Sequence, residues 1–146
     1  MCTEDLTELG VDVLVAAARL TRFAGRHVTG LPPAAMRLLG RLDELGPSRI
    51  GDLAKADRCS QPTMSALVQR QEEQGLVRRD PDPDDSRASL ISLTPAGRRE
   101  LDRGRRDAGE ALARRLGRLD AGDLRRLRDA VPVLRAVLTL PEEALS

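Results

Sequence analysis

The sequence predicts a mainly α-helical fold that contains one small β-hairpin, and three observations support this prediction. Apolar residues recur every three or four positions along most of the chain, as they do in amphipathic helices. Clusters of proline and glycine divide the chain into segments of helix length. Residues 76–93 lack this spacing and carry two short apolar runs around a turn rich in Asp and Pro. With 146 residues, 40% of them hydrophobic, the chain fits one domain with a modest core.

Two helices are expected in the first third of the chain. The first runs from Asp5 to about His27, where the segment "TGLPP" interrupts the pattern with residues that break helices. The second continues from there to Leu45 and ends at "GPS". The apolar faces that define them are Leu6, Leu9, Val13, Ala16, Ala17, Leu20 and Ala24 in the first helix, and Met36, Leu38, Leu39 and Leu42 in the second.

Two short helices joined by a tight turn are expected next. Residues 49–57 form the first, because they place a small apolar set on one face. Ser60 can cap the second, which begins at Gln61 and tolerates Pro62 in its first turn, where the missing N–H costs little. Gly75 is expected to end this helix because glycine accepts a positive φ.

A hairpin and two longer helices complete the predicted fold. Residues 76–79 and 88–93 are expected to be short strands, and residues 80–87 between them a turn rather than paired strand. Thr94 is expected to cap a long Arg-rich helix of about six turns. The last helix spaces Leu and Val three and four residues apart, and Pro132 is expected to kink it.

Two short helices followed by a hairpin are the order of elements in a winged helix-turn-helix, whose second helix enters the major groove of DNA. This order explains why the helix that begins at Gln61 has a small inward apolar set and an otherwise polar surface. Base edges and phosphates of DNA would be the partners of that polar surface. Gln can hydrogen-bond adenine, Arg can hydrogen-bond guanine, and apolar groups can contact thymine methyls. The candidate DNA-binding residues on this helix are Ser60, Gln61, Pro62, Thr63, Ser65, Gln69 and Arg70.

Further candidate contacts come from cations on and around the hairpin. Arg87 is expected to enter a narrow minor groove, where the negative potential is enhanced. Arg49, Arg78 and Arg79 are expected to neutralise phosphates. The four Asp residues of the turn would repel phosphates if they pointed at DNA, so most are expected to face solvent or to pair with Arg.

The stretch "SQPTMSALVQRQEEQGLVRRDPDPDDSRASLISLTPAG" resembles the recognition helix and wing of the MarR (multiple antibiotic resistance regulator) family of bacterial transcription regulators. The matching residues are Asp85 and Arg87 in an Asp-x-Arg pair, followed by "LISLTPAG" at the strand-to-helix junction. The resemblance implies a homodimer that binds double-stranded DNA at a near-palindromic operator and usually represses transcription. It also implies that Arg87 enters the minor groove and that Asp85 holds the wing or that Arg.

The resemblance covers the full length and implies a domain organisation. Residues 1–146 would form a single domain in which residues 1–30 and 99–146 are dimerisation helices and residues 31–98 bind DNA. At one position the chain departs from the family, since Gln71 stands where Leu is usual. Looser packing of the recognition helix, or a polar contact at its C-terminal end, is expected there.

Regulation by a ligand or by oxidation is a further expectation. Many members of the family release DNA when a small aromatic or phenolic compound binds between the dimerisation and DNA-binding regions. The candidate effector-binding residues are Arg19, Arg22, Phe23 and His27, whose cations would attract an anionic effector. Alternatively, Cys59 precedes the N-terminus of the recognition helix, where the helix dipole can favour oxidation and make a redox-responsive regulator. A small thiol buried between helices is the simpler interpretation of Cys59.

Several other classes of function are not supported by the sequence. No apolar run approaches the ~18 residues of a membrane span, and the N-terminus is acidic, so a cytoplasmic protein is expected. The two cysteines lie far apart in the sequence, so reduced thiols are expected. One His and the absence of nucleophile, phosphate-loop or metal-ligand motifs predict no enzyme, no cofactor and no metal. A net charge of +1 does not by itself indicate DNA binding. The remaining alternatives are an architectural DNA binder without an effector and a helical module whose winged region binds protein.

Overall fold

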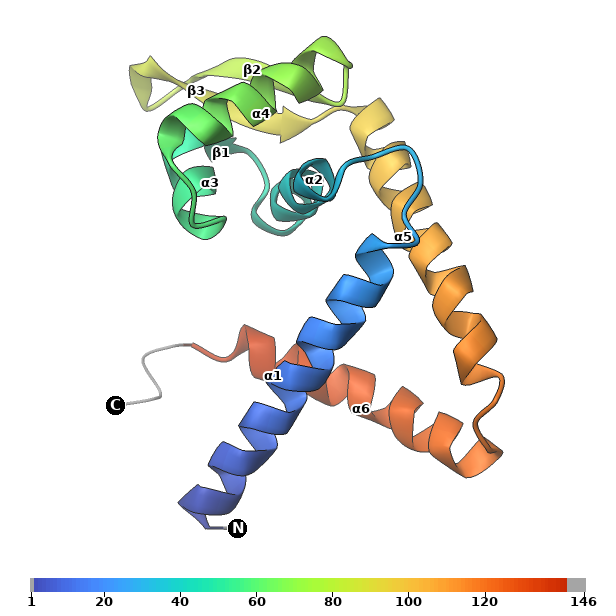
Figure 1. Cartoon of the computed structure of the whole chain (residues 1–146). Helices are drawn as coiled ribbons and strands as arrows, with labels where there is room; N and C mark the ends of the chain where they lie inside the picture. The colour runs from blue at the N-terminus through green and yellow to red at the C-terminus, as the bar shows by residue number, and fades with distance from the viewer. Residues whose placement is uncertain (1, 142–146) are drawn as a thin grey trace. The chain divides into compact units, whose positions relative to one another are not determined.

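The computed structural model describes residues 2–141, and Figure 1 shows how the chain alternates helices with a small sheet. The mainly helical class with a small hairpin is confirmed. The elements within the described residues are α1 (Thr3–Gly25), α2 (Pro33–Leu45), β1 (Ser48–Arg49), α3 (Ile50–Ala56), α4 (Gln61–Glu73), β2 (Val77–Asp82), β3 (Asp85–Leu93), α5 (Pro95–Leu116) and α6 (Ala121–Thr139).

The chain divides into two compact units, Met1–Gly109 and Glu110–Ser146, and the division falls inside α5. The first unit contains the helix-turn-helix and the hairpin. Within residues 2–141, no helix combines the length and the low charge that crossing a membrane requires. This geometric division does not test the expected functional division, which stays a prediction.

The predicted helix ends are confirmed at the positions where a side chain caps the helix or a glycine terminates it. The Ser60 hydroxyl accepts a hydrogen bond from the backbone N–H of Thr63 at 3.2 Å, and the Thr94 hydroxyl accepts one from Gly97 at 3.0 Å. Gly75 follows α4 with φ at 74°, the left-handed conformation expected of it. The last helix remains helical through Pro132, and the predicted kink there stays a prediction.

The sheet has a third strand that the sequence did not predict. Ser48 and Arg49 form β1, which pairs antiparallel with β3 through Ser48 to Ile91 and Arg49 to Leu90, in the strand order β1-β3-β2. The expectation that residue 49 begins a helix was therefore wrong, because α3 starts one residue later. Two residues are too short to show a strand pattern, and their pairing depends on β3, which lies about forty residues away in the sequence.

The strands of the hairpin also extend further than predicted. Pro81 pairs with Ser89 and Asp82 with Asp85, so both residues belong to β2 rather than to a long turn. Proline is tolerated here because β2 is an edge strand, where a missing N–H removes no ladder hydrogen bond. The register shifts between Pro81 and Asp82, as expected of a bulge near the tip.

One hydrophobic core holds α2, α3, α4 and the sheet together. The predicted inward residues of α4 and α2 are buried in it, except Met36, which is partly buried and packs against it. Both apolar faces are therefore confirmed. Removing these side chains from water is the main favourable term that fixes α4 on the other elements. The buried core members are Leu31, Ala35, Leu38, Leu39, Leu42, Leu53, Ala54, Met64, Leu67, Val68, Leu76, Val77, Ile91 and Leu101.

Polar contacts fasten the start of α5 to the rest of the first unit. Asp43 of α2 forms ion pairs with Arg98 and with Arg105, the latter at 2.7 Å. Hydrogen bonds from Arg98 and then Arg105 lower the pKa of the Asp43 carboxyl. Two residues after Arg105, Asp107 accepts hydrogen bonds from the hydroxyl and the backbone N–H of Thr29. These contacts orient α5 where it leaves the hairpin.

Candidate nucleic-acid interface

Helix α4 has the two-sided surface that a recognition helix needs. Met64, Leu67 and Val68 are buried, whereas the candidate contact residues point away from the core. Ser65 is partly exposed, and the exposed candidates are Ser60, Gln61, Pro62, Thr63, Gln69 and Arg70. Figure 1 shows α4 lying along the hairpin formed by β2 and β3. The arrangement therefore presents a polar helix face beside a wing.

The N-terminus of α4 is fixed by its own side chains. The hydroxyls of Ser60 and Thr63 lie 2.8 Å apart, in addition to the capping bond from the Thr63 N–H. Pro62 occupies the first turn, where its fixed φ suits the helix. The first turn of α4 is consequently ordered before any partner binds, which lowers the entropy lost on binding.

Two aspartates shape the tip of the wing. The Asp85 carboxylate accepts a hydrogen bond from the backbone N–H of Arg87 at 2.9 Å, and the Asp82 carboxylate accepts one from Asp84 at 2.9 Å. Such bonds from Asp to the backbone two residues on stabilise tight turns. The side chain of Arg87 is exposed and makes no hydrogen bond or ion pair within residues 2–141. The wing thus holds its backbone and leaves this guanidinium available.

An ion pair between a buried carboxylate and a half-exposed arginine joins the wing to the start of α3. Asp82 is only 5% exposed, and its carboxylate lies 2.5 Å from the guanidinium of Arg49 on β1. The hydrogen bond from the Asp84 N–H, followed by the one from Arg49, lowers the pKa of the Asp82 carboxyl. Arg49 is expected from the sequence to contact phosphate, and in the structure it anchors the hairpin. A buried carboxylate needs such a partner.

Other predicted phosphate ligands also have carboxylate partners within the chain. Arg79 is 2.8 Å from Glu72 at the end of α4, and Arg78 is 2.9 Å from Asp80 on the same strand. By contrast, Arg70 of α4 forms no ion pair among the described residues. Because exposed ion pairs are weak, these arginines can exchange partners, and their roles as DNA contacts stay predictions.

Gln71 lies in the core at the C-terminal end of α4. Its side chain is 3% exposed, and its Oε1 atom has no hydrogen-bond partner among the described residues. This oxygen makes no polar contact within residues 2–141, and the looser packing of the helix stays a prediction. An unsatisfied buried polar atom lowers stability.

The candidate effector residues lie along α1 and just after it. Phe23 is buried, and its ring centroid is 4.3 Å from that of His27, whose Nδ1 lies 2.7 Å from the Phe23 carbonyl oxygen. Arg19 and Arg22 are exposed on the same helix. His27 and Phe23 are brought together by their spacing of four residues. Their binding of an effector stays a prediction.

The two cysteines are free thiols in different settings. Cys2 is exposed, whereas Cys59 is partly buried and packs against the core next to the N-cap of α4. The packing agrees with a small thiol between helices. Oxidation of Cys59 stays a prediction. Within residues 2–141, no group of His, Cys, Asp and Glu is arranged to hold a metal ion.

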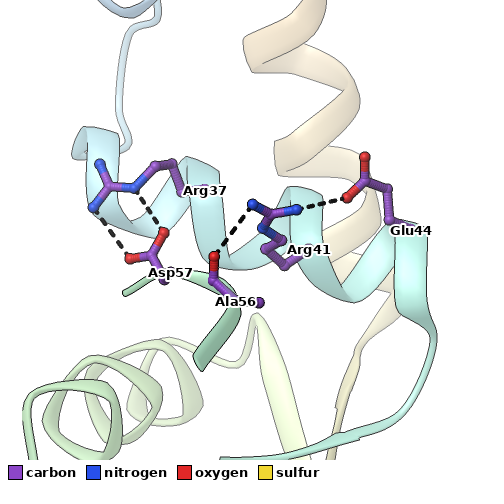
Figure 2. A network of polar contacts seen from close by, with 5 residues as sticks. All are labelled: Arg37, Arg41, Glu44, Ala56 and Asp57. Carbon is purple, nitrogen blue, oxygen red and sulfur yellow. Dashed lines mark hydrogen bonds and ion pairs between the residues drawn. The ribbon is translucent and has the colours of Figure 1, made fainter. Parts of the chain in front are cut away.

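Sequence reasoning missed a polar network that holds the turn between α3 and α4, which Figure 2 shows. Arg37 of α2 donates two hydrogen bonds to Asp57, at 3.0 and 3.3 Å. Arg41 donates to Glu44 at 3.2 Å and to the carbonyl oxygen of Ala56 at 3.4 Å. Partners some fifteen to twenty residues apart leave no periodic pattern in the sequence, so no local signal could have found them.

Comparison with known proteins agrees with this geometry. Residues 31–89 match the model of the MarR family. An HTH-type transcriptional regulator of Mycobacterium bovis is 30% identical over 89% of this chain and 92% of its own length. The HTH-type transcriptional repressor NicR of Pseudomonas putida is 35% identical over 57% of this chain and 49% of its own length. A MarR family transcriptional regulator from Streptomyces coelicolor, solved in complex with DNA, is 26% identical with a TM-score of 0.57 over 98% of this chain and 92% of that one. The chain is therefore a winged helix-turn-helix protein that belongs to the MarR family of transcriptional regulators.

Proposed function

We propose that this protein is a homodimeric repressor that occupies a near-palindromic operator through two copies of α4 and the wing. Members of the MarR family are DNA-binding transcriptional regulators and not enzymes. The proposal adds the oligomeric state, the kind of site and the direction of regulation. A two-fold dimer places two identical winged units on half-sites that repeat by symmetry.

The observation that carries the proposal is the polar face of α4 beside a wing that exposes Arg87. The buried face of α4 fixes the helix, and Asp85 holds the backbone of Arg87. Exposed polar side chains on one helix face suit base edges and phosphates, and an exposed guanidinium at a hairpin tip suits a narrow minor groove. The candidate contacts are Ser60, Gln61, Pro62, Thr63, Ser65, Gln69, Arg70, Arg49, Arg79, Asp85 and Arg87.

Two similarities support repression and operator binding. NicR, whose name describes a repressor, shares about half of its length with this chain. The Streptomyces coelicolor regulator of the same fold was solved on DNA. Repression would follow where the operator overlaps the promoter, because the bound protein would then block the polymerase.

The dimer would be built by the helices outside residues 31–98. Apolar residues are exposed along α1 and α6, and water-exposed faces of this kind are typical of interfaces. We assign residues 1–30 and 99–146 to dimerisation. An effector that loosens DNA binding remains part of the proposal, with Arg19, Arg22, Phe23 and His27 as its candidate ligands.

Fluorescence anisotropy with the DNA upstream of the protein's own gene tests this function. The wild-type dimer is expected to bind that DNA more tightly than scrambled DNA, with an affinity that falls as salt rises. Arg87→Ala is expected to weaken binding by roughly tenfold, since contacts of charged groups contribute about 1.5–3 kcal/mol. Arg114→Ala, an exposed arginine of α5 outside the candidate contacts, is the control. Its mass in solution is measured first, and a variant with the mass of the wild type should bind DNA like the wild type. Equal binding to both DNAs, or an unaffected Arg87→Ala variant, would contradict the proposal.

A further inference from the structure

Helices α3 and α4 end in the same hydrogen-bonded motif. After α3, the N–H of Cys59 donates to the carbonyl oxygen of Ala54 at 3.0 Å. The N–H of Arg58 donates to the carbonyl oxygen of Lys55 at 3.2 Å. After α4, the corresponding bonds run from the N–H of Leu76 to the carbonyl oxygen of Gln71 and from the N–H of Gly75 to that of Glu72, both at 2.9 Å. This pair of bonds defines the Schellman motif, which requires a left-handed residue just beyond the helix.

The two motifs differ in the residue that takes the left-handed conformation. Gly75 fills it after α4 with φ at 74°, and Arg58 fills it after α3 with φ at 52°. Within residues 2–141, Arg58 is the one residue other than glycine with a positive φ. Such a conformation is unfavourable for a residue with a Cβ atom, so an arginine there lowers stability relative to glycine. Backbone strain that persists at one position is a reason to look for a function of its side chain.

The side chain of Arg58 is available to a ligand outside the protein. It is exposed and makes no ion pair or hydrogen bond with the part of the chain that the structure describes. The nearest carboxylate in the sequence, Asp57, accepts hydrogen bonds from Nε and Nη2 of Arg37 (Figure 2). The bond from Arg41 to the Ala56 carbonyl fixes the same turn. The network therefore orders the turn and keeps Asp57 from capturing Arg58.

The position of Arg58 places this free cation next to the candidate interface. Arg58 precedes the N-cap Ser60 by two residues, so its Cα lies within about 7 Å of that of Ser60. Lys55, in the last turn of α3, is exposed in the same region and adds a second positive charge. The positive end of the α4 dipole adds to this potential.

We propose that Arg58 is a further DNA-contact residue, whose guanidinium binds a phosphate of the backbone that flanks the recognition helix. The inference rests on the proposed DNA-binding function. It assigns to this arginine a contact that carries affinity without sequence preference, because phosphates are the same for every base. The chain places a charged arginine at position 58, although glycine would suit the left-handed backbone of that turn better.

Arg58→Gly removes the charge and the backbone strain together while keeping the motif, and the two losses act on different measurements. Loss of the strain raises stability, and loss of the charge lowers DNA affinity. The melting temperature is expected to rise by roughly 2–8 °C. DNA affinity is expected to fall about fivefold for each half-site, equally on operator and scrambled DNA. A plot of the logarithm of the binding constant against the logarithm of the salt concentration should become less steep by about 0.9 per half-site. Thermal unfolding and anisotropy at several salt concentrations measure these effects on the full-length protein.

Two matched variants complete the test. Arg58→Lys keeps a charge and should retain most of the salt slope, and Gly75→Ala in the second motif should lower the melting temperature without altering that slope. If the wild type binds its operator and Arg58→Gly binds with unchanged affinity and salt slope, the inference is wrong and the proposed function stands. If the wild type shows no salt-dependent binding to DNA, both are wrong.

Discussion

Asp82 illustrates how a single side chain connects the wing to the rest of the molecule. Its carboxylate is nearly buried and accepts hydrogen bonds from the Asp84 backbone and from Arg49. Burial alone would favour the neutral acid, but the bonds to the charged form outweigh it and lower the pKa. The charged carboxylate is therefore the form that holds the tip of the hairpin.

The lowered pKa of Asp82 predicts how stability depends on pH. The unfolded carboxyl titrates near ~3.9, and the folded one titrates lower, so the stabilisation is fully present above that value and is lost as pH falls through the folded pKa. Asp82→Asn should be less stable than the wild type at pH 7, and the difference should shrink as pH falls below about 4. Urea unfolding across this range measures it.

Asp84→Asn is the control for this prediction, because Asp84 sits in the same turn with its side chain exposed. It should unfold like the wild type at pH 7. A difference between wild type and Asp82→Asn that stays constant down to low pH would show that the ion pair does not stabilise the wing.

At the scale of elements, the junction of the hairpin with α5 gives a physical reason for the motif "LTPAG". Thr94 caps α5, and its hydroxyl donates a hydrogen bond to the carbonyl oxygen of Gly75 at 2.5 Å. Its backbone N–H donates to the carbonyl oxygen of Leu76 at 3.1 Å. A Cβ atom at Gly97 would lie 2.0 Å from the Leu76 carbonyl oxygen. Only glycine lets the first turn of α5 approach the start of β2 this closely.

Gly97→Ala is therefore expected to destabilise the protein. The contact is with backbone, which cannot rotate away, so the cost should be of the order of overpacking, about 1–3 kcal/mol or more. Gly109→Ala in the same helix meets no atom within 4 Å and should instead stabilise by roughly 0.5–1 kcal/mol, because Ala favours helix. Chemical denaturation of both variants tests this, and a stable Gly97→Ala protein would refute the packing argument.

At the scale of the whole molecule, two helices leave apolar side chains in contact with water. Leu14 on α1 is 70% exposed and Leu138 on α6 is 84% exposed. Soluble proteins rarely expose such runs unless a partner covers them. The apolar residues concerned are Leu6, Leu9, Val11, Val13, Leu14, Val15 and Leu20 on α1, and Leu127, Val131, Val133, Leu134, Val137 and Leu138 on α6.

Sedimentation equilibrium is expected to find twice the 15.9 kDa mass of the chain. Leu14→Glu and Leu138→Glu should shift this equilibrium towards the monomer, since a carboxylate would be buried without a partner. Leu14→Met keeps the apolar volume and should remain dimeric. DNA affinity should fall together with dimerisation, because two linked half-site contacts bind more tightly than one. Unchanged mass in both Glu variants would exclude these faces as the interface.

Prediction from the sequence succeeded where structure depends on neighbouring residues. The caps at Ser60 and Thr94, the left-handed Gly75 and the buried face of α4 follow from interactions spanning four residues or fewer. The family followed from one contiguous stretch, which the comparisons confirm. The contacts of individual site residues with DNA, the effector site and the functional division of the chain stay predictions.

The sequence by itself determined the helices, their caps, the polar recognition face and the position of the wing, because propensity, periodicity and turn chemistry act locally. Only the tertiary structure decided which distant groups meet. It paired Arg49 with Asp82 across 33 positions and Arg37 with Asp57 across 20, and it added β1 to the sheet. Many arginines and carboxylates in this chain are nearly equivalent as partners, so the packing of the core selects among them by placing specific backbones within reach.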